Sequence, residues 1–190
     1  MKKFLTYDPK LLLYGFLILF FASYGQTFFI ALFNTEIKIF YGLSDGEFGL
    51  VYAIATLSSS FILISFAKLI DHLDLRVYSF IITLGFLFAC LGMVFLINNI
   101  LYLFLIIFML RFFGQGAMDH AGGTTMARYF GNDKGKALSV ATLGGIIGVM
   151  FLPYFALNFS KDIELSQLWL YATFSTVSYT HLTLPTILLV

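Results

Sequence analysis

Arg111, Gln115 and Asp119 stand four positions apart inside a long apolar stretch of the sequence, and His120 follows them directly. Residues at this spacing lie on one face of an α-helix, so the three side chains would form a polar stripe. An arginine stays charged and presents a fork of donors that matches an anionic group. The stripe therefore indicates an anion-binding or ion-coupling site, unless helix carbonyls or Asp119 simply hold Arg111 in place.

Asp119 and His120 allow two further interpretations. They would lie towards the cytoplasmic end of their helix, where such side chains often tie helix ends together. An Asp-His pair can also bind metal, but the sequence offers no second ligand pair at a suitable spacing. No nucleophile–base pattern is present either. We therefore expect no metal, no cofactor and no enzymatic activity.

A second polar group interrupts the first apolar run of the chain. Tyr24, Gln26 and Thr27 follow Ser23, and polar side chains in such a run either bond across helices or line a cavity. Gln26 is the residue of this group that best suits contact with a solute, and Tyr24 lies beside it. We expect both to face Arg111 across the binding site.

Six long apolar runs must position these residues. They cover residues 11–33, 48–70, 77–97, 100–121, 137–159 and 168–190. About 20 apolar residues in a helix cross the hydrocarbon core of a bilayer, whereas barrel strands alternate in polarity over about 10 residues. The chain is 60% hydrophobic and 11% charged, with a mean hydropathy of +0.94. These features predict an all-α membrane protein of six transmembrane helices, embedded in the lipid bilayer.

The basic residues predict the orientation of the helices. With a cytoplasmic N-terminus, two bases lie outside, Lys38 and Lys161, and one is intramembrane, Arg111. The remaining eight lie at the inner face: Lys2, Lys3, Lys10, Lys68, Arg76, Arg128, Lys134 and Lys136. This bias follows the positive-inside rule and favours a multi-pass protein of the cell (inner) membrane. The charged residues are therefore distributed between the two sides of a membrane, and their net charge of +1 does not indicate nucleic-acid binding.

An internal repeat relates the two halves of the sequence. Tyr24-Gly25-Gln26 recurs as Phe113-Gly114-Gln115, and at the same offset Phe40-Tyr41-Gly42 recurs as Tyr129-Phe130-Gly131. Three helices per repeat would place the second copy upside down, as in many secondary transporters. We therefore predict a 3+3 inverted repeat. Chance similarity among residues as abundant here as Gly and Phe is the alternative.

Small residues mark one side of the fifth run. Gly144, Gly145 and Gly148 would let another helix approach closely, and Pro153 would then kink the helix. Tight packing and a bend that helps a cavity open and close are compatible interpretations.

The loop between the second and third runs resembles a motif of the major facilitator superfamily. In Ala67–Arg76, the residues Leu69, Asp71 and Arg76 match the family pattern Gly-x-Leu-Ala-Asp-Arg-x-Gly-Arg-Lys. The departures are Ala67, His72, Asp74 and Leu75. Two further segments resemble family elements: Arg111-x-x-Gly114-x-Gly116, and Ala127–Phe130 with Gly135–Ser139, which is similar to the four–five loop of organic-anion-type members.

The resemblance implies one half of a twelve-helix transporter that works by alternating access. Arg111, Gln26, Tyr24 and Gln115 would bind the solute or couple ions. Asp71 and Arg76 would belong to a cytoplasmic gate, together with Asp119 and His120. A small organic anion moved with protons is the expected cargo, and a missing C-terminal six-helix half is the expected partner. The alternative is a six-helix membrane scaffold or channel-like protein that works as an oligomer.

The last residues of the chain differ from the rest in composition. From Ser175 the sixth run turns polar, and Val177–Thr186 resembles a translated sequencing-adapter tail. We expect a native bundle over residues 1–176 and a non-native tail over 177–190, unless the sixth helix is simply polar. As a fragment, the chain is expected not to transport alone.

Reporter fusions test the predicted orientation. A reporter that needs export should be active when fused after Asn34 and silent when fused after Lys134, because Asn34–Glu47 is an outer joint in this topology. Alkaline phosphatase activity in intact cells measures this. Activity only at Lys134 would show that the orientation is reversed.

Overall fold

The computed structural model describes residues 9–159 and 164–187, with side chains for residues 9–158 and 164–179. Nearly all of these residues are helical, which confirms the predicted all-α fold. The elements are α2 (Pro9–Ala22), η1 (Ser23–Gly25), α3 (Thr27–Ala31), α4 (Asn34–Tyr41), α5 (Asp45–Phe66), η2 (Ala67–Asp71), α6 (Leu75–Val94), α7 (Ile100–Met109), η3 (Leu110–Met118), α8 (Asp119–Tyr129), η4 (Gly131–Asp133), α9 (Lys134–Phe159) and α10 (Leu165–Ile187).

Five helical segments within the described residues are long and apolar enough to cross a membrane. They are Pro9–Ala31, Asp45–Asp71, Leu75–Val94, Ile100–Tyr129 and Gly131–Asn158. The sixth long helix, α10, is not among them, and its composition explains this, because Ser and Thr residues recur along it. The structure therefore shows five of the six predicted spans as apolar enough to cross a membrane, and a more polar helix, α10, at the place of the sixth.

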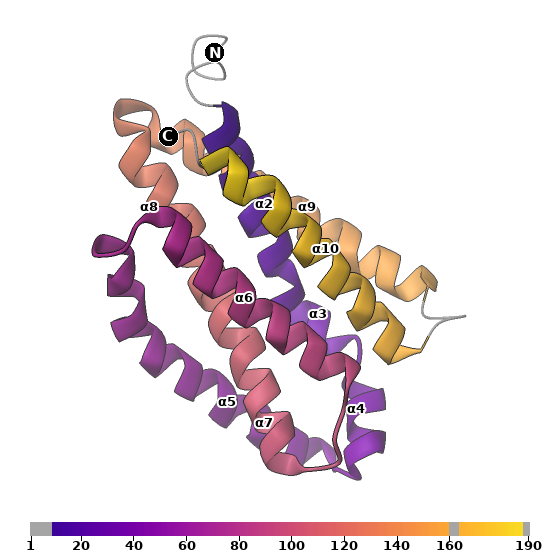
Figure 1. The fold of residues 1–190 in the computed structure, drawn as a ribbon. Coiled ribbons are helices and arrows are strands. Elements are labelled where there is room, and N and C mark those ends of the chain that lie inside the picture. Colours follow the sequence, from indigo (N-terminus) through magenta and orange to yellow (C-terminus); the bar gives the residue numbers. More distant parts are fainter. Residues whose placement is uncertain (1–8, 160–163, 188–190) are drawn as a thin grey trace.

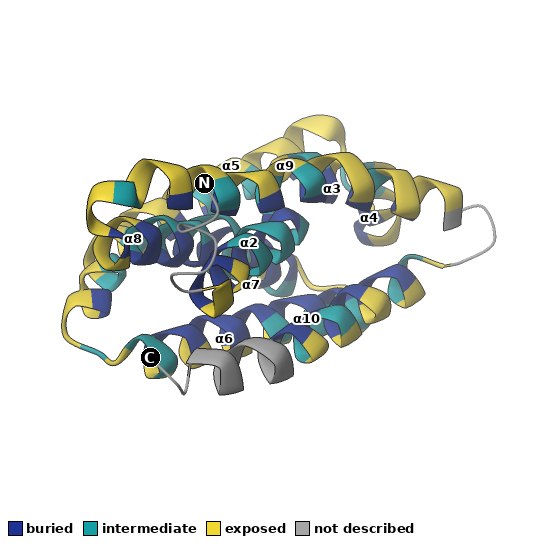
Figure 2. Cartoon of the chain, turned by 90° about the horizontal axis from the view of Figure 1, so that it is seen from above, coloured by how far each residue is buried: buried dark blue, intermediate teal, exposed yellow. Residues whose placement is uncertain are grey.

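The helices pack in three layers (Figures 1 and 2). α6 and α10 lie side by side on one side of the bundle, and α5 and α9 lie on the opposite side. The first span (α2 to α3) and the fourth (α7, η3 and α8) run between them. The outer faces of α5 and α9 are largely exposed, as expected of helices that contact lipid or another protein.

Several helix bounds differ from the sequence prediction. The fourth span was expected to end at residue 121 but continues to Tyr129, because polar side chains do not prevent helix continuation once the helix leaves the apolar layer. The joint 34–47 was expected to be a loop, but it holds α4, which ends where Gly42 adopts a left-handed φ of 65°. The third helix was expected to end at residue 97 but ends at Val94. The fifth and sixth helices both begin three residues before their predicted starts, at Lys134 and Leu165.

A capping box fixes the start of α5. The Ser44 side chain accepts from the Glu47 amide, and the Glu47 carboxylate accepts from the Ser44 amide at 2.8 Å. Two donors at the helix start are thereby satisfied, which is why the helix begins at Asp45 and not at the first apolar residue, Phe48.

The glycine-containing face of α9 packs against α2. A Cβ atom on Gly144 would lie 1.9 Å from the Phe16 carbonyl oxygen, and one on Gly148 would lie 2.4 Å from Ser23 Oγ. The Ser23 hydroxyl also donates to the Gly145 carbonyl at 3.4 Å. α9 continues through Pro153 as a single helix. The two glycines thus permit backbone-to-backbone contact between the first and fifth spans.

Substitution of Gly144 should disrupt this contact. Gly144→Ala is expected to lower the free energy of unfolding by about 1–3 kcal/mol, because the facing group is backbone and cannot rotate away. Denaturation of the purified chain in detergent, followed by the fluorescence of Trp169, measures this. Gly123→Ala is the control, since a Cβ there meets nothing within 4 Å and Ala favours the helix. Equal stability of the two variants would contradict the close approach.

Candidate functional site

The first and fourth spans cross at two glycines. A Cβ atom on Gly25 would lie 2.7 Å from the Gly114 Cα and 2.5 Å from the Leu110 carbonyl oxygen. A Cβ on Gly114 would in turn meet the Gly25 Cα at 2.8 Å. Only glycine allows the two backbones to come this close. Both glycines belong to the repeated triplets of the sequence, and the polar residues next to them form the candidate site.

The first span is broken at this crossing. Gln26 has an extended backbone (φ −77°, ψ 153°) between η1 and α3. The Phe29 amide donates to the Gln26 carbonyl, three positions back, at 3.2 Å. The Gly25 carbonyl is thereby left available, and Arg111 Nη1 donates to it at 3.3 Å. An unpaired carbonyl is costly inside a membrane, so the guanidinium helps to stabilise the break.

The fourth span is irregular at the same level. Leu110–Met118 forms a π-helix, in which each amide bonds five positions back. The sequence prediction assumed regular α-helical spacing for Arg111, Gln115 and Asp119, and the π-helix changes the angular spacing between them. π-helical segments are rare and are frequently found at functional sites.

Arg111 lies buried beside the crossing, with 8% of its surface exposed. Its Nε has no hydrogen-bond partner among the described residues, and none of the ion pairs in that part of the chain includes it. Its guanidinium carbon lies 5.6 Å from the centre of the Tyr52 ring, a cation–π contact. Asp119 lies close enough to act on this charge electrostatically, but no carboxylate of the described residues lies within ion-pair distance of it. A buried positive charge without a direct ion pair favours an anionic ligand.

Gln115 completes the polar surroundings of Arg111 on the π-helix. Its side-chain oxygen is buried and has no hydrogen-bond partner among the described residues. The hydroxyl of Tyr52 donates to Thr27 Oγ1 at 3.0 Å, which links α5 to the start of α3. Buried polar atoms are normally satisfied, so an unmet donor and an unmet acceptor on the same π-helix suggest a place for a polar ligand.

Asp119, which the sequence analysis assigned to a cytoplasmic gate, contacts the first span at this crossing. Its Oδ2 accepts from Gln26 Nε2 at 3.0 Å. The bond connects the break in the first span to the end of the π-helix in the fourth. The sequence showed both residues but gave no sign of the contact, because the break at Gln26 turns its side chain towards the fourth span.

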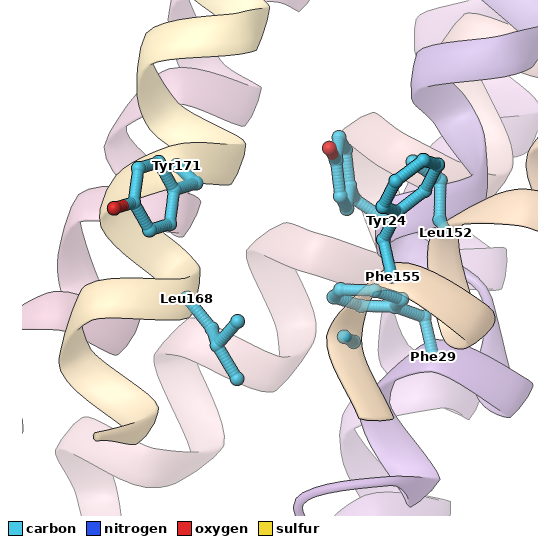
Figure 3. Close-up of a pocket in the computed structure, with 7 residues that line it drawn as sticks. Tyr24, Phe29, Leu152, Phe155, Leu168 and Tyr171 are labelled. Carbon is cyan, nitrogen blue, oxygen red and sulfur yellow. The ribbon is translucent and has the colours of Figure 1, made fainter. Parts of the chain in front are cut away.

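Tyr24 lies elsewhere. Its hydroxyl accepts from Ser175 Oγ of α10 at 3.3 Å, and its ring packs edge-on against Phe29 at 4.9 Å. Figure 3 shows its side chain at the wall of a separate apolar cavity. These contacts direct the Tyr24 side chain towards α10 and Phe29, and the prediction that it faces Arg111 stays a prediction.

At the other end of these spans, Asp71 pairs with Arg128 and not with Arg76. Arg128 Nη2 donates to Asp71 Oδ1, and its Nη1 donates to the Ile70 carbonyl at 3.1 Å. Arg76 lies 3.8 Å from Asp74, whose side chain caps α6. The contact of Arg128 ties the loop after α5 to the end of α8. The sequence analysis did not include Arg128 in the predicted gate, because no spacing in the sequence links it to Asp71.

His120 lies apart from both groups. Its Nε2 is 3.5 Å from Thr124 Oγ1, one turn along α8, and the side chain is partly exposed. In the described part of the chain, no three His, Cys, Asp or Glu side chains are close enough together to hold a metal ion.

A double-mutant cycle tests the contact between Asp71 and Arg128. Asp71→Asn, Arg128→Gln and the double variant should give a coupling energy of about 0.2–1 kcal/mol, since both side chains are partly exposed. Unfolding of the purified chain in detergent measures it. The same cycle with Arg76→Gln is the control and should give almost no coupling. A larger coupling to Arg76 would contradict the pairing seen here.

Comparison with known proteins agrees with the arrangement of the helices. The family model of the Major Facilitator Superfamily matches residues 15–184. No curated protein and no solved structure matches the chain. The match covers most of the sequence and includes the broken first span, the loop with Asp71 and the π-helical fourth span. The chain therefore belongs to the major facilitator superfamily, whose members are secondary transporters and not enzymes.

Proposed function

We propose that the chain forms the N-terminal, solute-binding half of a transporter that moves a small organic anion together with protons. A second six-helix half would complete the protein, and rocking of the two halves would alternate access to a site near the bilayer midplane. The observation that carries this proposal is the state of Arg111: it is buried, bonded to one backbone carbonyl and paired with no carboxylate among the described residues.

An anionic solute would supply the hydrogen-bond acceptor and the negative charge that Arg111 lacks. Its Nε is an unmet donor, and a carboxylate can accept from two guanidinium nitrogens at once. Gln115, which contributes an unmet acceptor nearby, would bind a donor group of the solute, such as a hydroxyl. A solute with a carboxylate and a neighbouring hydroxyl fits both atoms.

Asp119 is the group we assign to proton movement. It is the acidic residue within the fourth span, and Gln26 holds it against the break in the first span. Protonation would remove its charge and weaken this charge-assisted bond. The bond links the two irregular segments that flank Arg111, so the protonation state of Asp119 would be coupled to the geometry of the anion site.

The contact of Gly25 with Gly114 supports the inverted repeat. The two glycines occupy equivalent places in the repeated triplets, and equivalent residues meet only near the two-fold axis that relates the repeats. With the loop charges, this arrangement favours cytoplasmic ends for the six-helix unit in the cell membrane.

Substitution of Arg111 tests the proposal. In the full-length transporter, Arg111→Ala should lower uptake of the organic anion by about tenfold or more, the effect of losing a charge-assisted hydrogen bond. Arg111→Lys should restore little, because an ammonium cannot make the forked contact. Uptake into proteoliposomes at matched protein levels measures both.

The control is Lys134→Ala, an exposed cation at the start of α9, which should leave uptake unchanged. Near-normal uptake by Arg111→Ala would remove Arg111 from the site. Saturable, gradient-driven uptake by the 190-residue chain alone would overturn the half-transporter proposal and favour the six-helix oligomer.

A further inference from the structure

A cavity of about 340 Å³ lies between α9, α10 and the junction of η1 with α3, away from Arg111. Figure 3 shows Leu168 and Tyr171 of α10 on one side and Leu152, Phe155 and Phe29 on the other. Tyr24 and Ala156 complete the lining. No part of the proposed transport mechanism uses this space.

The lining determines what the cavity can hold. It consists of aliphatic and aromatic side chains, and none of the lining residues is charged. The Tyr24 hydroxyl already accepts from Ser175. Apolar cavities stay dry because water needs several polar partners, and a cavity of about 150 Å³ can bind benzene. This cavity is more than twice as large, so its natural occupant is an apolar molecule.

The mouth of the cavity is surrounded by exposed apolar side chains. Phe155 and Tyr171 line it and are 48% and 60% exposed, and next to them Tyr154 and Phe174 are 63% and 61% exposed. Large apolar side chains this exposed along a membrane span contact hydrocarbon. Whatever enters between α9 and α10 at this level therefore comes from the bilayer.

We propose that this cavity binds an acyl chain of a membrane lipid. A helix is about 10–12 Å wide, too thick to enter, whereas an acyl chain is slender and flexible. In lipid the gain comes from packing, because an empty cavity leaves its lining atoms without contacts. The bound chain would fill the gap between the fifth and sixth spans, independently of the solute.

Trp169 provides a built-in reporter. It is the only tryptophan of the chain, it is fully buried, and its ring packs edge-on against the lining residue Phe29 at 5.4 Å. A bromine atom on an acyl chain quenches indole fluorescence only at short range. A brominated chain inside the cavity would therefore quench Trp169 more strongly than lipid at the outer surface.

The experiment compares the purified 190-residue chain in nanodiscs of ordinary phosphatidylcholine with nanodiscs of phosphatidylcholine brominated in mid-chain. The wild type should be strongly quenched. Ala156→Phe fills the cavity and should lose most of the quenching. Ala53→Phe makes the same change at an exposed position of α5 and should keep it. Leu152→Ala enlarges the cavity and should increase quenching.

Circular dichroism and the Trp169 emission maximum in unbrominated lipid show whether each variant is folded. If Ala156→Phe fails to fold, Leu152→Ala decides, and unchanged quenching in that variant overturns the proposal. Equal quenching of the wild type and a folded Ala156→Phe would show only surrounding lipid and would also overturn it. So would quenching that falls as the protein-to-lipid ratio rises, since a second copy would then cover the mouth.

Discussion

The hydrogen bond from Arg111 to the Gly25 carbonyl is the interaction on which the centre of this bundle depends. It places a buried charge where the first span breaks, and the break exists because Gly25 and Gly114 allow two backbones to touch. Removing either glycine would separate the spans, and removing the guanidinium would leave a carbonyl unpaired in the membrane. Arg111 thus stabilises the break in the first span, and it is also the residue that we propose to bind the solute.

The remaining polar contacts are arranged around this crossing at two levels. Gln26 and Asp119 connect the same two spans next to Arg111, whereas Asp71 and Arg128 connect the loop after α5 to the end of α8. Tight packing of α2 on α9 at Gly144 holds the first span from its other side. The polar site therefore rests on a framework whose contacts are mostly apolar and close.

The sequence was sufficient to predict the membrane class and the family of the fold, because apolar runs of this length have few alternatives. It also identified Arg111, Gln26, Gln115 and Asp119 as candidates, since polar residues within such runs are rare. It could not assign partners. The break at Gln26 and the π-helix at Leu110–Met118 change the directions of side chains, and both arise from contact between segments far apart in the sequence. The same limit explains Tyr24, whose orientation is set by α10, and Arg128, whose partner lies in another loop. The predicted tail, residues 177–190, remains a prediction.

The crossing at Gly25 and Gly114 also has a mechanical consequence. No side chain lies between the two backbones at this point. The first and fourth spans can therefore change their crossing angle with little steric resistance where they touch. The fourth span, Ile100–Tyr129, is 30 residues long, or about 45 Å. A rotation of about 10° would then move each end by about 4 Å while the pivot hardly moves. A pivot of this kind would keep Arg111 in place while the end of the fourth span that carries Arg128 moves relative to the first span.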